Sequence, residues 1–123
     1  MSTITPIYVA VVDDDESVCR SVGRLLRAAG LQPITYASAE SFLADKKRAQ
    51  FGCLVLDIQL GAMSGIELAL KLVAEGGRIP TIFITAHDDP EARARAEAAG
   101  CAAYFRKTDS GTEVIDAIRR VAV

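Results

Sequence analysis

The chain has 123 residues, of which 50% are hydrophobic and 24% charged, so it is long enough for one domain and too short for two. Its formal net charge of -2 argues against direct nucleic-acid binding, which needs a clustered basic excess. No apolar run is long enough for a membrane span, and residues 1–6 lack the features of a signal peptide, so we expect a cytoplasmic protein without a membrane partner.

The three cysteines, Cys19, Cys53 and Cys101, indicate neither a disulfide framework nor a zinc site. Their number is odd, and they show no CxxC or Cys/His spacing. We interpret each as a small apolar residue buried in a reducing compartment.

The first part of the chain alternates strand and helix patterns. Residues 7–12 are apolar and β-branched, which predicts a central strand buried on both faces. Apolar residues at helical spacing over residues 18–29 predict a helix with one buried face. Residues 33–36 predict a short second strand, and Ser38 predicts the start of a second helix whose solvated end is the basic trio 46–48.

The middle of the chain repeats this alternation. Residues 53–56 predict a third buried strand, which ends abruptly at Asp57. The sequence Ser-Gly-Ile-Glu at residues 64–67 has the form of a capping box and predicts a helix that ends near Gly76. Residues 80–85 predict the fourth strand, which is again apolar and ends in a hydroxyl.

The last part of the chain predicts two further helices around a fifth strand. Pro90 marks a helix start, and because the buried face of this helix is mostly alanine we expect it to be loosely held. Residues 102–106 predict the fifth strand, with Lys107 directly after it. An apolar stripe over residues 114–122 predicts the final helix.

Five strands alternating with five helices predict an α/β fold, a parallel sheet with right-handed crossovers and helices on both faces. For five strands we expect the doubly wound, flavodoxin-like order 2-1-3-4-5, which places strands one and three side by side. This order brings Asp13 and Asp14, which follow strand one, next to Asp57, which follows strand three. We therefore expect a single domain over residues 1–123 with a carboxylate cluster at the carboxyl edge of its sheet.

The polar residues at the strand ends suit phosphoryl transfer. Three carboxylates in one crevice repel each other unless a cation is present, and oxygen ligands suit Mg²⁺. With the metal, Asp57 is a candidate nucleophile toward a phosphoryl group. Lys107 and the Thr85 hydroxyl are candidates to stabilise charge on the phosphoryl oxygens.

These residues give the chain a resemblance to the response-regulator receiver domains of two-component phosphorelay systems, the CheY-like family. The resemblance covers nearly the whole chain and depends on the order and spacing of its motifs rather than on any one of them. The motifs are Val-Val-Asp-Asp at residues 11–14, Leu-Asp at 56–57, Met-Ser-Gly at 63–65, Ile-Thr-Ala at 84–86 and the isolated Lys107.

The resemblance implies specific roles for the acidic cluster. Asp57 would accept a phosphoryl group from the phosphohistidine of a sensor histidine kinase or from a phosphotransfer protein. Asp14 would bind Mg²⁺ directly, Asp13 would assist through water, and the backbone carbonyl of Gln59 would complete the metal site. The protein would catalyse only its own phosphorylation and dephosphorylation and would otherwise not be an enzyme.

The resemblance also implies a switch and an output surface. Thr85 and Tyr104 would form a switch pair, in which the hydroxyl is drawn to the phosphoryl group while the ring moves inward. The surface formed by the fourth helix, fifth strand and fifth helix would then contact an effector or a second copy of the chain. Tyr104 also has a simpler interpretation as a packed edge aromatic, and we interpret His87 as a solvated loop histidine.

Two positions depart from the family pattern. Thr108 follows the lysine where the family usually has a proline with a cis peptide bond. Because a cis bond before a non-proline residue costs about 2.5–4 kcal/mol, we predict a trans bond or a distorted loop. Gly61 stands where a proline is common, so we expect the loop of residues 58–64 to be more mobile than usual.

Two other functions remain alternatives. Asp-Asp-Asp at residues 13–15 has the Asp-x-Asp form of haloacid-dehalogenase-like phosphatases, in which Asp13 would be the nucleophile. The second alternative is a degenerate receiver that signals through protein contacts without phosphorylation. These three functions differ in where a phosphoryl group is accepted: on Asp57, on Asp13, or on neither residue.

Overall fold

The computed structural model describes residues 6–86 and 89–122. His87 and residues 1–5 of the N-terminal segment, in which we expect no signal peptide, lie outside this range. Within it, no helix is long and apolar enough to cross a membrane.

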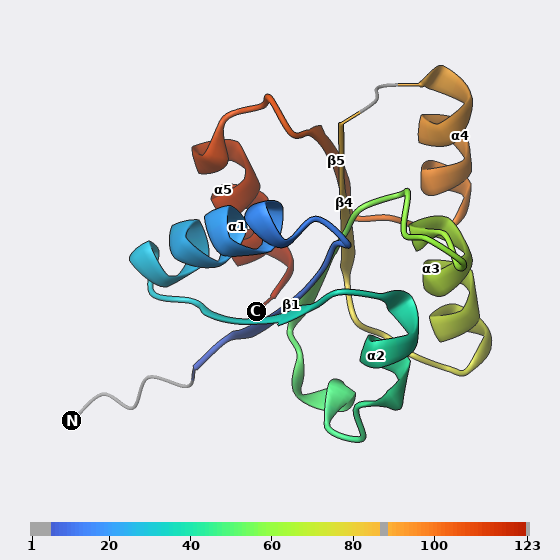
Figure 1. The fold of residues 1–123 in the computed structure, drawn as a ribbon, viewed down its shortest axis with the longest axis horizontal. Helices are drawn as coiled ribbons and strands as arrows, with labels where there is room; N and C mark the ends of the chain where they lie inside the picture. The colour runs from blue at the N-terminus through green and yellow to red at the C-terminus, as the bar shows by residue number, and fades with distance from the viewer. Residues whose placement is uncertain (1–5, 87–88, 123) are drawn as a thin grey trace.

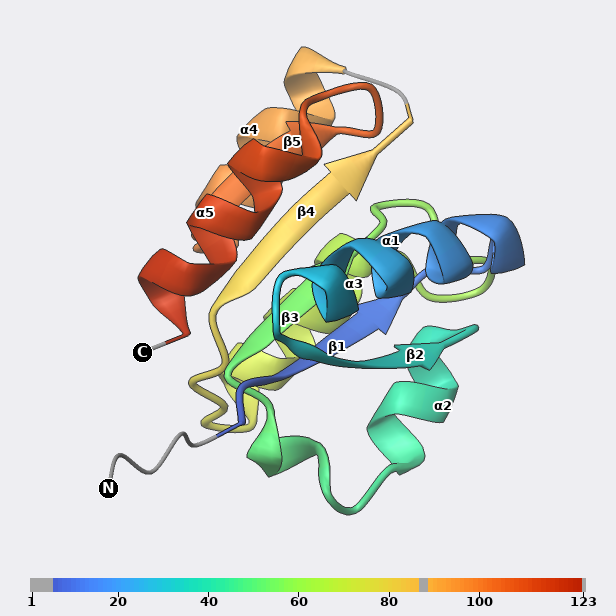
Figure 2. The same ribbon diagram turned by 90° about the vertical axis from the view of Figure 1, so that its left-hand side faces the viewer.

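The five strands form one parallel sheet in the order β2-β1-β3-β4-β5, as predicted (Figures 1 and 2). Their bounds are Tyr8–Val12 for β1, Gln32–Tyr36 for β2, Cys53–Leu56 for β3, Thr81–Thr85 for β4 and Ala103–Arg106 for β5. Because all strands run in the same direction, the residues that follow β1, β3, β4 and β5 gather at one edge of the sheet.

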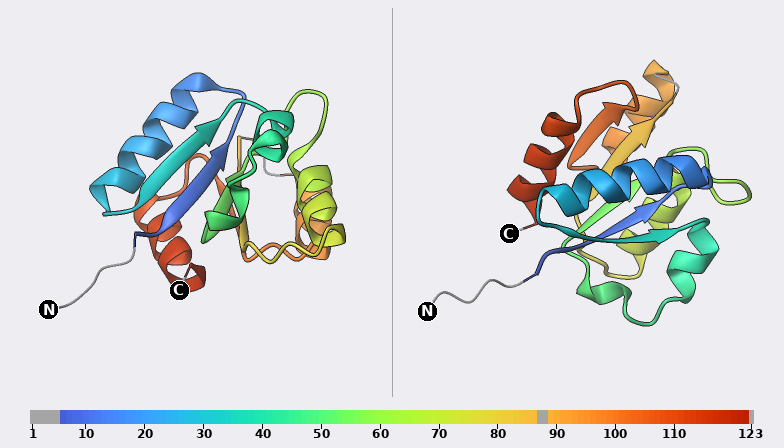
Figure 3. Two further views of the ribbon diagram at one scale, coloured as in Figure 1. Left: turned by 90° about the horizontal axis from the view of Figure 1, so that it is seen from below. Right: turned by 60° about the vertical axis from the view of Figure 1, so that its left-hand side comes forward.

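Helices cover both faces of the sheet. Helices α1 and α5 lie on one face, and α2, α3 and α4 lie on the other (Figures 1 and 3). Their bounds are Glu16–Ala28 for α1, Ala39–Ala44 for α2, Gly65–Ala74 for α3, Pro90–Ala98 for α4 and Gly111–Val121 for α5. This arrangement confirms the predicted doubly wound fold.

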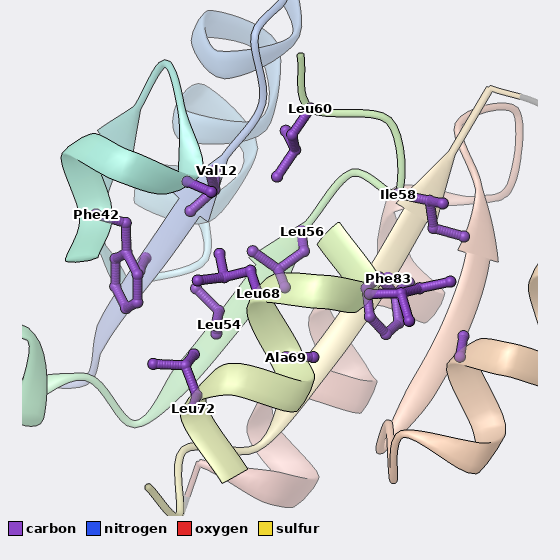
Figure 4. Packing of buried hydrophobic residues seen from close by; sticks show 14 of the residues in the cluster. Val12, Phe42, Leu54, Leu56, Ile58, Leu60, Leu68, Ala69, Leu72 and Phe83 are labelled. Carbon is purple, nitrogen blue, oxygen red and sulfur yellow. The ribbon is translucent and has the colours of Figure 1, made fainter. Parts of the chain in front are cut away.

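Successive strand residues pack into two separate cores. In β1, Val9 and Val11 belong to the core beneath α1 and α5, whereas Ala10 and Val12 belong to the core beneath α2, α3 and α4. Figure 4 shows the second core, in which Phe83 of β4 packs with residues of α3. A strand buried on both faces needs apolar residues at every position, which explains the continuous apolar runs in the sequence.

The basic trio of residues 46–48 is not a solvated helix end, so that interpretation was wrong. Helix α2 already ends at Ala44, and Arg48 begins a short 3-10 helix, η1, over Arg48–Gln50. The Arg48 guanidinium lies 3.1 Å from the Glu75 carboxylate at the end of α3 and also donates to the Leu43 carbonyl. A long-range ion pair of this kind has no signal in the local sequence.

The remaining local predictions are largely confirmed. Helix α4 begins at Pro90 and buries only Ala92 and Ala96, so little apolar area holds it; its loose attachment remains a prediction. All three cysteines are free. Cys19 and Cys53 are buried as expected, and burial raises the pKa of the Cys53 thiol to about 12, whereas Cys101 is partly exposed.

Candidate functional site

Asp57 lies directly beyond the end of β3 and is held by the backbone. Its N–H donates to the Val12 carbonyl at 3.1 Å, which extends the β1–β3 pairing by one residue. Its side chain is only 9% exposed, and its Oδ1 accepts a hydrogen bond from the Gln59 N–H at 3.2 Å. The strand therefore delivers this carboxylate to the edge of the sheet in a fixed orientation.

The start of α3 packs against the backbone of Asp57. Ser64 and Glu67 form the predicted capping box, and the Gly65 N–H donates to the Ile58 carbonyl at 2.8 Å. A Cβ atom added at Gly65 would lie 2.1 Å from the Asp57 carbonyl oxygen. Only glycine allows this approach, a requirement that sequence reasoning missed although Gly65 belongs to the Met-Ser-Gly motif.

Asp13 and Asp14 follow β1 but differ in exposure. The Asp13 N–H donates to the Tyr36 carbonyl at 3.1 Å, and its buried carboxylate accepts from the Asp15 N–H at 2.9 Å. Burial raises the pKa of Asp13, and the nearby Asp57 acts in the same direction, while the Asp15 N–H and Lys107 oppose the shift. Asp14 is exposed.

The three carboxylates converge as predicted. One oxygen each from Asp13, Asp14 and Asp57 lies within 4.8 Å of the others. Such a set of hard oxygen donors fits a divalent cation such as Mg²⁺, which is usually held by one or two carboxylates and several waters. Gln59 is exposed in the loop after β3, and its predicted carbonyl ligand remains a prediction.

Lys107 joins two of these carboxylates. Its Nζ lies 3.0 Å from Oδ2 of Asp13 and 3.0 Å from Oδ2 of Asp57. Partial burial opposes its charge, but hydrogen bonds to the two carboxylates outweigh that effect and raise the pKa of Lys107. The ammonium group thus partly neutralises the cluster without a metal.

The backbone around Lys107 departs from the family pattern as expected. The peptide bond between Lys107 and Thr108 is trans. The Lys107 N–H donates to the Thr85 carbonyl at 2.8 Å, which continues the β4–β5 pairing. The chain then turns through an Arg106–Asp109 hydrogen bond that sequence reasoning did not identify.

Thr85 and Tyr104 lie on the same face of the sheet. Thr85 pairs with Arg106 and Phe83 pairs with Tyr104, so side-chain alternation places both candidate switch residues on the side of α4. Thr85 is buried, and the Tyr104 ring packs against the core beneath α4 with its hydroxyl oxygen buried. The Arg93 guanidinium of α4 lies 5.1 Å from the centre of this ring. The hydroxyl end of the Tyr104 side chain is therefore buried, whereas the residue as a whole is partly exposed.

Gly61 adopts a conformation that proline cannot. Its φ of +53° lies in the left-handed region, whereas a proline ring fixes φ near about −65°. The path of the loop therefore excludes proline and favours glycine here, and the expected mobility of residues 58–64 remains a prediction.

Comparison with known proteins gives one consistent result. The sequence model of the response regulator receiver domain family matches residues 9–119. The chain is 36% identical over 111 residues to the response regulator protein TmoT of Ectopseudomonas mendocina, an alignment covering 90% of this chain and 50% of that protein. It is 35% identical over 119 residues to the transcriptional regulatory protein FixJ of Rhizobium meliloti, covering 97% and 58%. The chain thus spans about half the length of these relatives.

Solved structures agree with the sequence comparison. The crystal structure of FixJ-N has a TM-score of 0.89 and 34% sequence identity, covering 97% of this chain and 95% of that one. A response regulator receiver protein from Burkholderia phymatum has a TM-score of 0.82 and 41% identity, covering 96% and 95%. The fold, the strand-end residues and these matches show that the chain belongs to the response-regulator receiver domain family of two-component signalling.

Proposed function

We propose that this receiver domain accepts a phosphoryl group on Asp57 in a Mg²⁺-dependent reaction. The observation that carries the proposal is the convergence of the Asp13, Asp14 and Asp57 carboxylates, with the Lys107 ammonium 3.0 Å from two of them. Asp57 fits the acceptor role because the backbone holds it at the strand end, with a carboxylate oxygen within 4.8 Å of oxygens of Asp13 and of the exposed Asp14.

In the proposed step, an Asp57 carboxylate oxygen attacks the phosphorus atom of a phosphohistidine. A new P–O bond forms, the P–N bond breaks, and the imidazole leaves with its electron pair and takes up a proton. Bound Mg²⁺ would neutralise charge on the phosphoryl oxygens, held by Asp14 and Asp57 directly and by Asp13 through water. Lys107 would hold a second phosphoryl oxygen and Thr85 a third, because both lie at the same sheet edge.

We further propose that phosphorylation acts on the α4-β5-α5 surface. Thr85 ends β4 and Tyr104 packs beneath α4, so a shift of the Thr85 hydroxyl toward a phosphoryl group would change how the ring and α4 pack. The partners would be a sensor histidine kinase or phosphotransfer protein, and downstream an effector or a second copy of the chain. The site of action would be the cytoplasm.

We favour the phosphorylated receiver over the phosphatase and the degenerate receiver. Membership of the receiver family separates the chain from haloacid-dehalogenase-like phosphatases, and the acids expected of a phosphorylated receiver are present and adjacent. The domain would then act chemically only on itself. A degenerate receiver remains an outcome of the experiment.

The test uses acetyl phosphate as a small phosphoryl donor. The purified chain is incubated with acetyl phosphate and Mg²⁺, and peptide mass spectrometry locates the phosphoryl group. We expect modification of Asp57 that requires Mg²⁺ and is lost in Asp57→Asn. Modification of Asp13 would favour the phosphatase, and no modification with acetyl phosphate or a phosphohistidine donor would favour the degenerate receiver.

A further inference from the structure

Lys107 lies within a tight turn that Asp109 closes. Lys107 and Thr108 are the two central residues of this turn, and Arg106 and Asp109 are its outer residues. The Asp109 N–H donates to the Arg106 carbonyl at 2.9 Å, which is the hydrogen bond that defines a β-turn. The direction in which the Lys107 side chain leaves the backbone is thus set within this turn.

The Asp109 side chain closes the same turn a second time. Its Oδ2 accepts from the Arg106 N–H at 2.8 Å, and its Oδ1 lies 3.3 Å from the Arg106 guanidinium. The Arg106 N–H lowers the pKa of Asp109, and the Arg106 charge acts in the same direction, so the carboxylate is ionised at neutral pH. Because β5 is an edge strand, an outward N–H there has no neighbouring strand to pair with.

The sequence leaves this turn without another local restraint. A proline at the third position of a turn fixes its own φ and, when cis, closes a type VI turn by itself. Thr108 occupies that position here, with a trans bond before it, and a threonine imposes no comparable limit. The structure shows instead the hydrogen bonds between Asp109 and Arg106, which add to the bond from the Lys107 N–H to the Thr85 carbonyl.

We propose that Asp109 is a positioning residue for Lys107. By closing the Arg106–Asp109 turn, it keeps the Lys107 ammonium between the Asp13 and Asp57 carboxylates. Its consequence for phosphorylation rests on the function proposed above, but the positioning itself does not. Sequence inspection does not reveal this role, because an aspartate two residues after the lysine resembles any other polar loop residue.

The first experiment measures how well the lysine ammonium is held. Competitive acetylation with an N-hydroxysuccinimide ester, read by peptide mass spectrometry, gives the reactivity of Lys107 relative to the exposed Lys46 of the same molecule. Asp109→Ala, which removes the acceptor, should raise this ratio by about threefold or more. Asp109→Asn retains an acceptor oxygen for the Arg106 N–H and should stay near the parent value.

The controls separate positioning from general effects. Glu40→Ala removes an exposed acid from α2, beside the opposite edge of the sheet, and should leave the ratio unchanged. Dispersed NMR spectra confirm that each variant is folded, and Asp109→Val serves as a second variant without an acceptor oxygen if the alanine variant does not fold. An unchanged Lys107 ratio in the folded variant that lacks the acceptor, or equal increases in the alanine and asparagine variants, would overturn the proposal.

The second experiment measures the consequence for phosphorylation. Acetyl phosphate should modify Asp57 about tenfold more slowly in Asp109→Ala than in the parent, because a displaced ammonium no longer meets the phosphoryl oxygen, and Asp109→Asn should rescue the rate. If the parent is not modified at all, the proposed function fails while the acetylation ratio still decides whether Asp109 positions Lys107.

Discussion

The close contact between Gly65 and Asp57 leads to a prediction for Gly65→Ala. The added methyl carbon would lie 2.1 Å from the Asp57 carbonyl oxygen, whereas ordinary contacts begin near 3.4 Å. The start of α3 and the Asp57 backbone must therefore separate by more than an ångström. Because both atoms belong to or adjoin the main chain, no side-chain rotation can relieve the overlap.

The expected loss of stability follows from this overlap. Overpacking costs about 1–3 kcal/mol, and loss of the hydrogen bond from the Gly65 N–H to the Ile58 carbonyl adds about 1 kcal/mol. We therefore expect the free energy of unfolding, measured with urea, to fall by about 2–4 kcal/mol. A displacement of about 1 Å in the nucleophile should also slow modification of Asp57 by acetyl phosphate by about tenfold to a hundredfold.

Gly23→Ala is the matched control. Gly23 lies inside α1, and a Cβ there would meet its nearest heavy atom, in the flexible Arg27 side chain, at 3.6 Å. The change should raise the free energy of unfolding by about 0.5–1 kcal/mol through helix propensity and leave Asp57 modification unchanged. The reasoning would be refuted if Gly65→Ala matched the parent in both stability and Asp57 modification.

Three further predictions concern the carboxylate cluster and α4. Lys107→Met leaves Asp13 and Asp57 without their cation, so the free energy of unfolding, measured with urea in EDTA, should fall by about 1–3 kcal/mol. Mg²⁺ should reduce this loss, and an equal loss with and without Mg²⁺ would contradict the prediction. The folded-state pKa of Asp13 lies above its ordinary value of 3.8, so its contribution to stability is lost as pH rises through the raised pKa. Asp13→Asn lacks this titration, so its free energy of unfolding should rise relative to that of the parent between pH 3.8 and the raised pKa, measured in EDTA from about pH 3 to 7. A difference between the two proteins that does not change with pH would disprove this. Amide hydrogen exchange should be faster in α4 than in α3, because α4 buries only two alanines; equal protection would show that other contacts hold it.

The main features of the fold and much of the candidate site follow from the sequence. Strands buried on both faces appear as apolar runs, and each run stops at a polar residue such as Asp13, Asp57 or Lys107. Parallel strands bring those stops to one edge, so the order of strands was enough to predict that the three residues meet. The distances in the structure bear this out.

Other features depend on contacts that no local pattern encodes. The burial of Asp13 beside the exposed Asp14 is decided by how β1 packs, although the two residues are chemically identical. The pairing of Arg48 with Glu75 joins segments 27 residues apart.

The sequence by itself determined which elements form, their order and which side chains reach the site, because hydrophobic periodicity and strand ends are local properties. Tertiary structure alone decided that Gly65 must lack a side chain and that the turn closed by Asp109 places Lys107 beside Asp13 and Asp57. The first depends on how closely the start of α3 approaches the Asp57 backbone, and the second on contacts between residues far apart in the chain, so both distances exist only after the chain has folded.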